Sequence, residues 1–394
     1  MNVVIEAKRA RAVHYNTFMD VLVIGGGVIG LSCAFYLARA GARVALVDQG
    51  ELGGEASWAG AGMITSQSTK RAHTPLGKLK TRSAALMPEL SVTLKELTGL
   101  DNGYQRCGAL ELRSSVADLE RRRQSRPGQE CVEHAEQPAE EDGGLGGRVV
   151  GVAELRALEP ALAPDLPGAI WYPEAAQVRN PWHVRALIAA CQRLGVDLRS
   201  GCPVFAMTRR GERITDVATS TGRLQPGQVL VCTGAWSGGI GASLGLSWPV
   251  RPVRGQIVLM RAQPGLLQRM LLAGPRYLVP RLDGRVLVGS TEEDVGFDKS
   301  TTAVAQAELL QMALGYVPAL GLFPVEKSWA GLRPASGDGK PILGPVPGFE
   351  NLFVATGHFR SGLQLSPVTG MLMQQLLQGQ TPELDLSPFR LDRF

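Results

Sequence analysis

The sequence has few of the residues that build metal clusters, disulfide frameworks or membrane spans. Of its 394 residues only 6 are cysteine and 5 are histidine, and no two cysteines have C-x-x-C spacing. We therefore predict no metal site, and reduced thiols of the kind found in cytoplasmic proteins. No apolar run approaches the roughly 18 residues that a membrane-spanning helix needs, so no membrane partner is expected.

Charge of one sign is not in large excess either. The chain has 41 basic and 36 acidic residues, a net charge of +5. A surplus of this size does not indicate nucleic-acid binding, although it mildly favours anionic ligands. Residues 1–18 lack the apolar core of a signal peptide, and we interpret them as an N-terminal extension. The polar stretch 121–147 is predicted to be a solvated insertion.

What the sequence does contain is a dinucleotide-binding motif close to its N-terminus. An apolar run at 20–24 precedes Gly25, Gly27 and Gly30, which have the spacing G-x-G-x-x-G. The first glycine permits a tight turn, the second lets a pyrophosphate approach the backbone, and the third packs helix against strand. Asp48 ends the next predicted strand, where a ribose hydroxyl needs a carboxylate. The motif alone does not choose between NAD and FAD.

Small residues dominate the segment 53–62 that follows Asp48. Such a segment lets the backbone come close to something flat, and a flavin ring is a good candidate. Within it, Ser57 is a candidate donor to a phosphate. The segment therefore favours FAD and disfavours an NAD-dependent dehydrogenase.

The order of predicted elements indicates two kinds of sheet. The length predicts two domains, and buried strands at 20–24, 43–48 and 228–233 are typical of a parallel sheet. From Pro249 onward the strands become antiparallel in character, with a hairpin turn predicted at Asp283 and Gly284. The predicted fold class is α/β, with a Rossmann-like dinucleotide-binding domain and a second, mainly antiparallel-sheet domain.

Two arginines late in the chain are candidate substrate ligands. Arg333 lies in the glycine- and proline-rich segment 329–344, which we predict to be a loop. An arginine there can form two parallel hydrogen bonds to a substrate carboxylate, which fix the orientation of the substrate as well as neutralise its charge. Arg360 follows an apolar strand at 352–355 and precedes a last helix near 367–378. Backbone amides at the start of that helix are suited to an anionic flavin.

From about residue 20 to residue 394 the chain resembles the glycine oxidase family of thiamine biosynthesis, within the D-amino-acid oxidase superfamily of FAD enzymes. The motifs that carry the resemblance lie at 23–30, 55–63, 232–237, 277–281, 329–334 and 357–362. The last two are the most specific. The resemblance implies oxidative deamination of glycine, and also of sarcosine or small D-amino acids. It further implies that O2 is reduced to H2O2, and that the imine serves thiazole synthesis or hydrolyses to glyoxylate.

Residue by residue, the resemblance implies a substrate carboxylate held by Arg333, Arg360 and Tyr277. No further catalytic residue is implied, because the flavin itself accepts the hydride. The implied FAD contacts are Gly25, Gly27, Val28, Ile29, Gly30, Asp48, Gln49, Ala56, Ser57, Ala61, Gly62, Met63, Val204, His358, Phe359, Arg360, Ser361, Gly362, Leu363 and Gln364. The chain departs from the family at Asp48, where many members have glutamate, and at Glu292, where a relative has methionine.

Several expectations follow from this reading. No cysteine lies in 233–394, which removes the covalent anchor of the sarcosine oxidases and predicts non-covalent FAD. A homo-oligomer and contact with thiazole-synthesis proteins are also expected. The predicted FAD domain comprises 19–97, 174–251 and 322–394, and the substrate domain comprises 98–173 and 252–321.

Other functions stay open at this point. The nearest is a sarcosine or D-amino-acid oxidase of the same superfamily, or a dehydrogenase that passes electrons to a quinone. A non-catalytic flavin-binding module is a third possibility, against which the pairing of Arg333 and Arg360 argues.

Overall fold

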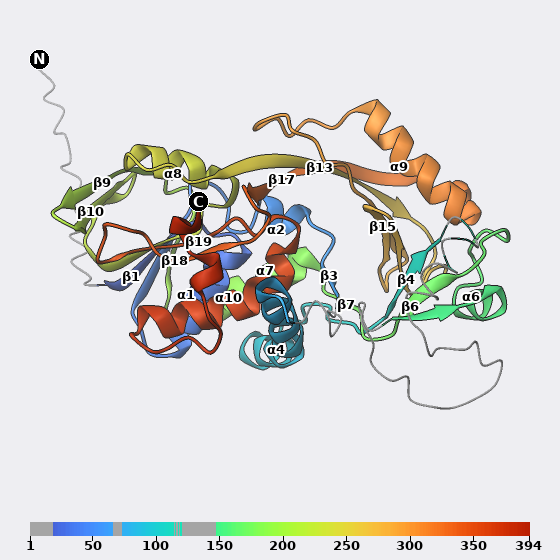
Figure 1. Ribbon diagram of the computed structural model, residues 1–394, viewed down its shortest axis with the longest axis horizontal. Coiled ribbons are helices and arrows are strands. Elements are labelled where there is room, and N and C mark those ends of the chain that lie inside the picture. Colours follow the sequence, from blue (N-terminus) through green and yellow to red (C-terminus); the bar gives the residue numbers. More distant parts are fainter. Residues whose placement is uncertain (1–18, 66–72, 114, 116, 118, 120–146) are drawn as a thin grey trace, which may run out of the picture.

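The computed structural model describes residues 19–65, 73–113, 115, 117, 119 and 147–394, and it contains two large sheets (Figure 1). The extension 1–18 and nearly all of the stretch 121–147 lie outside the described residues. Within the described part of the chain, no helix has the length and apolar character needed to span a membrane.

The first sheet has six strands in the order β18-β19-β12-β1-β2-β8. All neighbours are parallel except the edge strand β18, which is antiparallel to β19. The strands are β1 (Met19–Ile24), β2 (Val44–Val47), β8 (Asp197–Arg199), β12 (Pro226–Val231), β18 (Ile342–Pro345) and β19 (Leu352–Thr356). Three of them, β1, β2 and β12, end in buried apolar residues, as expected for strands covered on both faces.

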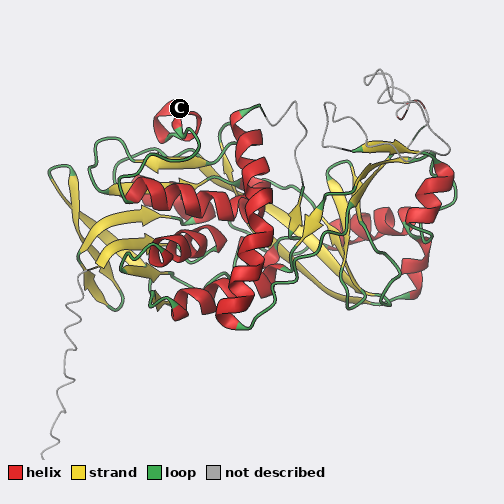
Figure 2. Ribbon diagram, turned by 90° about the horizontal axis from the view of Figure 1, so that it is seen from below, coloured by secondary structure: helices red, strands yellow, loops and turns green. Residues whose placement is uncertain are grey.

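Successive side chains of β1 enter two different cores. Val21 and Val23 pack with four helices on one face, while Leu22 and Ile24 pack on the other face with a three-stranded antiparallel sheet. The helices are α1 (Val28–Arg39), α4 (Pro75–Thr98), α7 (Asn180–Arg193) and α10 (Gly362–Leu377). The small sheet contains β9 (Val204–Arg210), β10 (Arg213–Thr219) and β11 (Gly222–Leu224). Figure 2, which views the molecule from below, shows these helices lying over the six-stranded sheet.

The second sheet has eight strands in the order β17-β13-β16-β15-β14-β4-β6-β5, and only β14 and β4 are parallel neighbours. The turn predicted at Asp283 and Gly284 joins β15 to β16, with Gly284 at φ +83°. One face packs under α9 (Ala303–Tyr316) and α6 (Val152–Leu158). The strands are β4 (Ala109–Leu112), β5 (Arg148–Val150), β6 (Ala169–Tyr172), β13 (Val250–Arg261), β14 (Met270–Ala273), β15 (Arg276–Pro280), β16 (Arg285–Gly289) and β17 (Val325–Ser336).

The long strands β13 and β17 run between the two regions of the molecule, above the centre of Figure 1. They pair with each other from Val250 and Ser336 onward, so β17 belongs to the antiparallel sheet although the sequence analysis assigned 322–394 to the FAD domain. The domain boundaries stay a prediction. The fold class is confirmed: a parallel Rossmann-like sheet and a mainly antiparallel one.

The remaining elements are short. They are α2 (Ala56–Ala59), β3 (Met63–Ile64), β7 (Ala176–Gln177), α8 (Ser237–Ser243) and the 3₁₀ turns Gly234–Trp236, Pro318–Leu322, Phe359–Ser361, Ser387–Phe389 and Leu391–Arg393. The buried Arg281 directly follows β15 and forms hydrogen bonds to β7 and to the segment before β3. Its guanidinium donates to Gln177 Oε1 at 2.6 Å and to the Ala61 carbonyl at 2.8 Å, and burial lowers its pKa to about 10.

Candidate active site

A cavity of about 710 Å³ lies between the carboxyl ends of the parallel strands and the inner face of the antiparallel sheet. Ile24 and Val47 line it from β1 and β2, and Ile257 and Tyr277 line it from β13 and β15. Ligand pockets typically hold about 300–1,000 Å³, and open parallel sheets bind ligands beyond their carboxyl ends. The cavity therefore has the size and the place of a ligand site.

The glycine-rich turn after β1 forms one wall of this cavity. Gly25 has φ +107°, and a Cβ there would lie 2.5 Å from the Cys232 carbonyl oxygen. A Cβ at Gly30 would lie 1.9 Å from the Gly25 carbonyl oxygen. Both positions therefore admit only glycine, the first for the turn and the second for the close approach of α1 to the strand.

Helix α1 presents its N-terminus to the cavity. Its N-cap residue Gly27 has no side chain to bond the first amides, and Ser57 supplies an acceptor by taking the Val28 N–H at 2.8 Å. Gly27, Val28 and Ile29 all line the cavity. A helix N-terminus with open amides attracts anions such as a pyrophosphate.

Asp48 lies at the end of β2, where the ribose contact was predicted. Its carboxylate accepts the Gly26 N–H at 2.6 Å and the Gly50 N–H at 2.8 Å. A carboxylate has about four acceptor positions, so these bonds hold the side chain in place and leave capacity for a hydroxyl donor. The ribose contact itself stays a prediction.

The small-residue segment packs closely against α7. A Cβ at Gly62 would lie 2.0 Å from the Val178 carbonyl oxygen, which explains glycine there. Asn180 donates to the Ser57 carbonyl at 3.0 Å, while its Oδ1 is buried with no partner among the described residues. Asn180 lines the cavity, so this orphaned acceptor fits a ligand that brings a hydroxyl or N–H donor.

The pair Asn180-Pro181 predicts a helix with Asn180 as its N-cap and Pro181 at its first position. We expected Asn180 to cap α7, but the N-cap is Arg179 and the Asn180 side chain is used elsewhere. Asparagine before proline is a helix-start signal, and nothing in the local sequence distinguishes a cap from a cavity residue.

Arg333 lies on β17, opposite Val253 of β13, and not in a loop as predicted. The segment 329–336 contains glycine and proline, which favoured a loop, but pairing with β13 makes it a strand. The guanidinium donates to Ser290 Oγ at 2.6 Å and to the Thr291 carbonyl at 3.0 Å. Burial lowers the pKa of Arg333, with Tyr277 partly offsetting the effect.

The partners of Arg333 are therefore neutral. A buried guanidinium without a bonded carboxylate is costly unless an anion completes it. Tyr277, on β15, lies in the same part of the cavity, with its ring against Gly289. Arg333 and Tyr277 together form a partly buried, cationic end of the cavity, suited to a small carboxylate.

Arg360 also lines the cavity but differs from Arg333 in its surroundings. It forms an ion pair with Glu292, and the two side chains are 39% and 47% exposed. The structure thus places both predicted arginines at one cavity, one buried with neutral partners and one at the surface with a charged partner.

The turn that carries Arg360 has an unusual backbone. Phe359 has φ +48°, which is strained for a residue other than glycine. His358 is buried and contacts Thr369 through its Nε2 at 3.0 Å, and burial lowers its pKa to about 3. Helix α10 begins at Gly362, five residues before the predicted start, and Pro367 lies within it.

The sequence-predicted residues gather at the cavity with few exceptions. Of the implied FAD contacts, Gly30 and Ser361 do not line it, and all others do. Ser290, Thr291 and Asn180 were missed as contacts, because no motif marks them. Among the described residues, no three histidine, cysteine, aspartate or glutamate side chains gather as a metal site.

Comparison with known proteins gives consistent results. A family model described as FAD dependent oxidoreductase matches residues 20–376. Glycine oxidase of Pseudomonas aeruginosa is 39% identical, over 94% of this chain and 97% of the relative. The bifunctional protein ThiO/ThiG of Trichormus variabilis is 34% identical, over 95% of this chain and 55% of that longer protein.

Solved structures agree with this assignment. Glycine oxidase from Geobacillus kaustophilus superposes with a TM-score of 0.85 at 35% identity, covering 95% of this chain and 99% of the other. Iminodiacetate oxidase from a Chelativorans species gives 0.81 at 32% identity, covering 94% and 98%. The resemblance noted in the sequence is confirmed, and the chain belongs to the family of FAD dependent oxidoreductases.

Proposed function

We propose that this enzyme oxidises glycine, and secondarily sarcosine or small D-amino acids, with O2 as the electron acceptor. One observation carries the proposal: Arg333, partly buried and hydrogen-bonded to neutral acceptors among the described residues, lines the same cavity as the glycine-rich motif. A bound amino-acid carboxylate gives this guanidinium the charged partner it lacks. The dinucleotide motif at the other end of the cavity is suited to FAD.

The main contribution of the protein's side chains to the reaction is to orient the substrate. FAD, when bound, accepts a hydride from the substrate Cα and passes two electrons to O2, which becomes H2O2. Arg333 holds the carboxylate and Tyr277 donates a further hydrogen bond, so Cα is fixed before transfer. His358 does not serve as a base, because it is buried against Thr369 with its pKa lowered to about 3. The imine product hydrolyses in water to glyoxylate and ammonia.

The fit of FAD rests on features of this chain. The N-terminus of α1 offers free amides to a pyrophosphate, Gly62 and its small neighbours let a ring lie against the backbone, and Asn180 Oδ1 offers an unused acceptor.

Two described cysteines, Cys202 and Cys232, line the cavity, and both are buried. Burial raises the pKa of the Cys232 thiol, whereas at Cys202 burial is outweighed by hydrogen bonds with Thr221 and Thr219, which lower the pKa. No cysteine lies in 233–394, where a covalent flavin anchor of the sarcosine oxidase kind would be found. Non-covalent FAD is therefore proposed.

The experiment is a substrate screen on the purified yellow protein. Glycine, sarcosine and D-proline are each supplied with air, and peroxide is measured by a coupled dye. We expect peroxide from glycine, and loss of the flavin absorbance on anaerobic glycine addition. Flavin bleaching without peroxide, together with turnover on a quinone-like dye, would identify a dehydrogenase. A yellow protein that none of the three substrates bleaches would contradict the proposal.

Wider biological roles are part of the same proposal. The name of the Trichormus relative joins a ThiO part to a ThiG part in one chain, which supports delivery of the glycine imine to thiazole synthesis. We also propose a homo-oligomer located in the cytoplasm, to be tested by light scattering and by cell fractionation.

A further inference from the structure

Two consecutive glutamates, Glu292 and Glu293, directly follow Ser290 and Thr291, which bond Arg333, and they have different partners. The segment that carries them pairs with β13: Arg254 N–H donates to the Glu293 carbonyl at 2.9 Å, and Glu293 N–H donates to the Arg254 carbonyl at 3.0 Å. The Gln256 N–H donates to Thr291 Oγ1 at 2.9 Å. The backbone from 291 to 293 is therefore fixed against a central strand.

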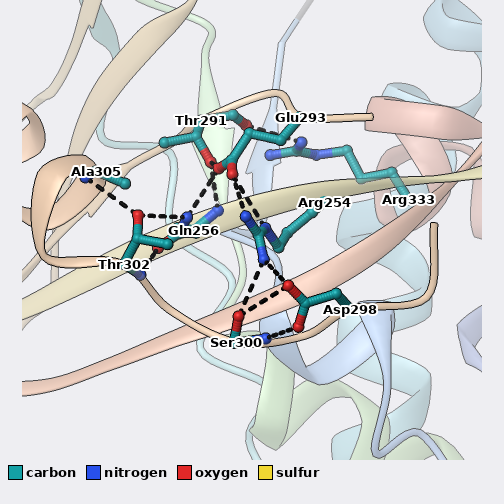
Figure 3. A network of polar contacts seen from close by, with 9 residues as sticks. All are labelled: Arg254, Gln256, Thr291, Glu293, Asp298, Ser300, Thr302, Ala305 and Arg333. Atoms are coloured by element: carbon teal, nitrogen blue, oxygen red, sulfur yellow. Dashed lines mark hydrogen bonds and ion pairs between the residues drawn. The ribbon is translucent and has the colours of Figure 1, made fainter. Parts of the chain in front are cut away.

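Glu293 belongs to a polar network with Arg254, Gln256 and Thr291, and the Thr291 carbonyl also accepts from Arg333 (Figure 3). Its carboxylate accepts from Arg254 Nε at 3.1 Å, from Gln256 Nε2 at 2.9 Å and from the Thr291 hydroxyl. Arg254 also donates to Asp298 at 2.5 Å. Burial opposes ionisation of Glu293, but the bonds from Thr291 and Arg254 prevail and lower its pKa. This carboxylate stays charged and satisfied.

Glu292 instead forms the ion pair with Arg360. The same short segment therefore supplies acceptors to both guanidiniums of the cavity. Arg333 donates to the uncharged Ser290 hydroxyl and Thr291 carbonyl. Arg360 instead pairs with the negatively charged carboxylate of Glu292. Arg333 is left to bind an anion, while Arg360 is already neutralised.

We propose that Glu292 is a specificity-determining residue that restricts the cavity to substrates with one carboxylate. The inference rests on the proposed function, since it concerns the choice of substrate at that site. A substrate with a second carboxylate, such as an imino dicarboxylate, would bring that group to Arg360 and meet the charge of Glu292 there. Like-charge repulsion of this kind excludes a ligand without improving the binding of the preferred one.

The test is a change of substrate preference. In Glu292→Gln, Arg360 keeps a neutral neighbour and becomes free for a second carboxylate. The ratio of kcat/KM for iminodiacetate to that for glycine should rise about tenfold, through KM for iminodiacetate and not through kcat. In the double variant E292Q/R360Q the ratio should return toward that of the starting enzyme, because the second carboxylate then has no cation to bind.

A matched control is available at the surface. Glu350 pairs with Arg213 far from the cavity lining, and both side chains are about half exposed, at 54% and 52%. Glu350→Gln removes the same charge and should leave the substrate ratio unchanged. Should E292Q lose its flavin, Arg360→Gln offers a second test: unpaired Glu292 should then lower the ratio below that of the starting enzyme.

The outcomes separate the two proposals. If the starting enzyme oxidises glycine and E292Q has an unchanged ratio, Glu292 does not select substrates and the inference is overturned. If glycine gives no turnover, the proposed function fails instead. The inference is then judged from the perturbation of flavin absorbance by iminodiacetate, which should appear at lower concentration in E292Q. An equal response in both proteins overturns it.

Discussion

Gly255 of β13 lies against the guanidinium of Arg333 on β17. A Cβ built at Gly255 would be 2.1 Å from Arg333 Nη2 and 2.3 Å from its Cζ. Its backbone is ordinary β-strand, so glycine is present for the space it leaves and not for its conformational freedom. The arrangement sets the position of the charged group that is proposed to bind the substrate.

Gly255→Ala should therefore displace Arg333 without changing its charge. We expect KM for glycine to rise about tenfold or more, since small misplacements of a binding group are costly, while FAD stays bound. Steady-state kinetics and the flavin spectrum give the two readings. Gly239→Ala is the matched control, because a Cβ there meets nothing within 4 Å. Equal kinetics for both variants would show that Arg333 adapts to the added methyl.

Removal of the charge should have a larger effect than its displacement. Arg333→Ala deletes a partly buried cation whose loss leaves the substrate carboxylate unpaired, an effect of about 2–5 kcal/mol. KM for glycine should rise about 100-fold or more in a protein that remains yellow. Measured kinetics that match those of the unsubstituted enzyme would remove Arg333 from the site.

At the cofactor end, Ser57→Ala removes the acceptor that fixes the Val28 N–H at the start of α1, beside the glycine-rich turn. A hydrogen bond of this kind contributes about 0.5–1.5 kcal/mol, and its loss leaves the turn to be ordered when FAD binds, so the dissociation constant of FAD should rise about fivefold. Titration of the apoprotein with FAD, followed by flavin fluorescence, gives the value. Ser243→Ala is the control, since this serine is exposed and bonds only the Ile240 carbonyl. A loss of FAD affinity in S243A as large as that in S57A, or no loss in S57A, would contradict the assignment.

Acid stability should depend on a buried histidine far from the substrate. His183 contacts Asn102 at 3.1 Å, and burial lowers its pKa from 6.5 to about 4. As the pH falls, His183 takes up a proton in the unfolded chain before it does so in the folded protein. Its contribution to the free energy of unfolding is therefore fully present above pH 6.5 and is lost as the pH falls toward 4. The loss is about 1.4 kcal/mol per pH unit.

The measurement is urea unfolding at pH 7, 6 and 5. In His183→Gln the free energy of unfolding should fall less steeply with pH than in the unsubstituted protein, whatever its value at pH 7. The exposed His73 gives the control, and His73→Gln should keep the original slope. An unchanged slope in H183Q would mean that His183 titrates alike in both states.

Elements with strong local signals were predicted well from the sequence. Leucines spaced by three, four or seven residues over 74–99, with Gly99 as a stop, predict a helix. The structure has α4 there, at Pro75–Thr98. Thr74 caps it by accepting the Gly77 N–H at 3.0 Å, and Gly99 ends it at φ +73°. Apolar spacing and a terminal glycine act within a few residues, so the helix and its end can be read directly from the chain, whereas the cap at Thr74 is given by the structure.

Features that depend on distant partners were not predicted. The strand character of Arg333 comes from pairing with a segment some 80 residues away, which a window around Trp329 does not reveal. The Glu292–Arg360 pair joins residues 68 positions apart. Resemblance to a family marked both arginines as ligands, but only the fold gives them different partners.

The pairing of β13 with β17 has a consequence for how this enzyme can vary. Their register is continuous from Val250 opposite Ser336 to Leu259 opposite Lys327, and it shifts only before Met260. A one-residue insertion or deletion ahead of that shift would turn Arg333 to the opposite side of its sheet. Insertions and deletions in descendants of this chain should therefore accumulate beyond Leu259, where they leave the side of the sheet that Arg333 faces unaltered.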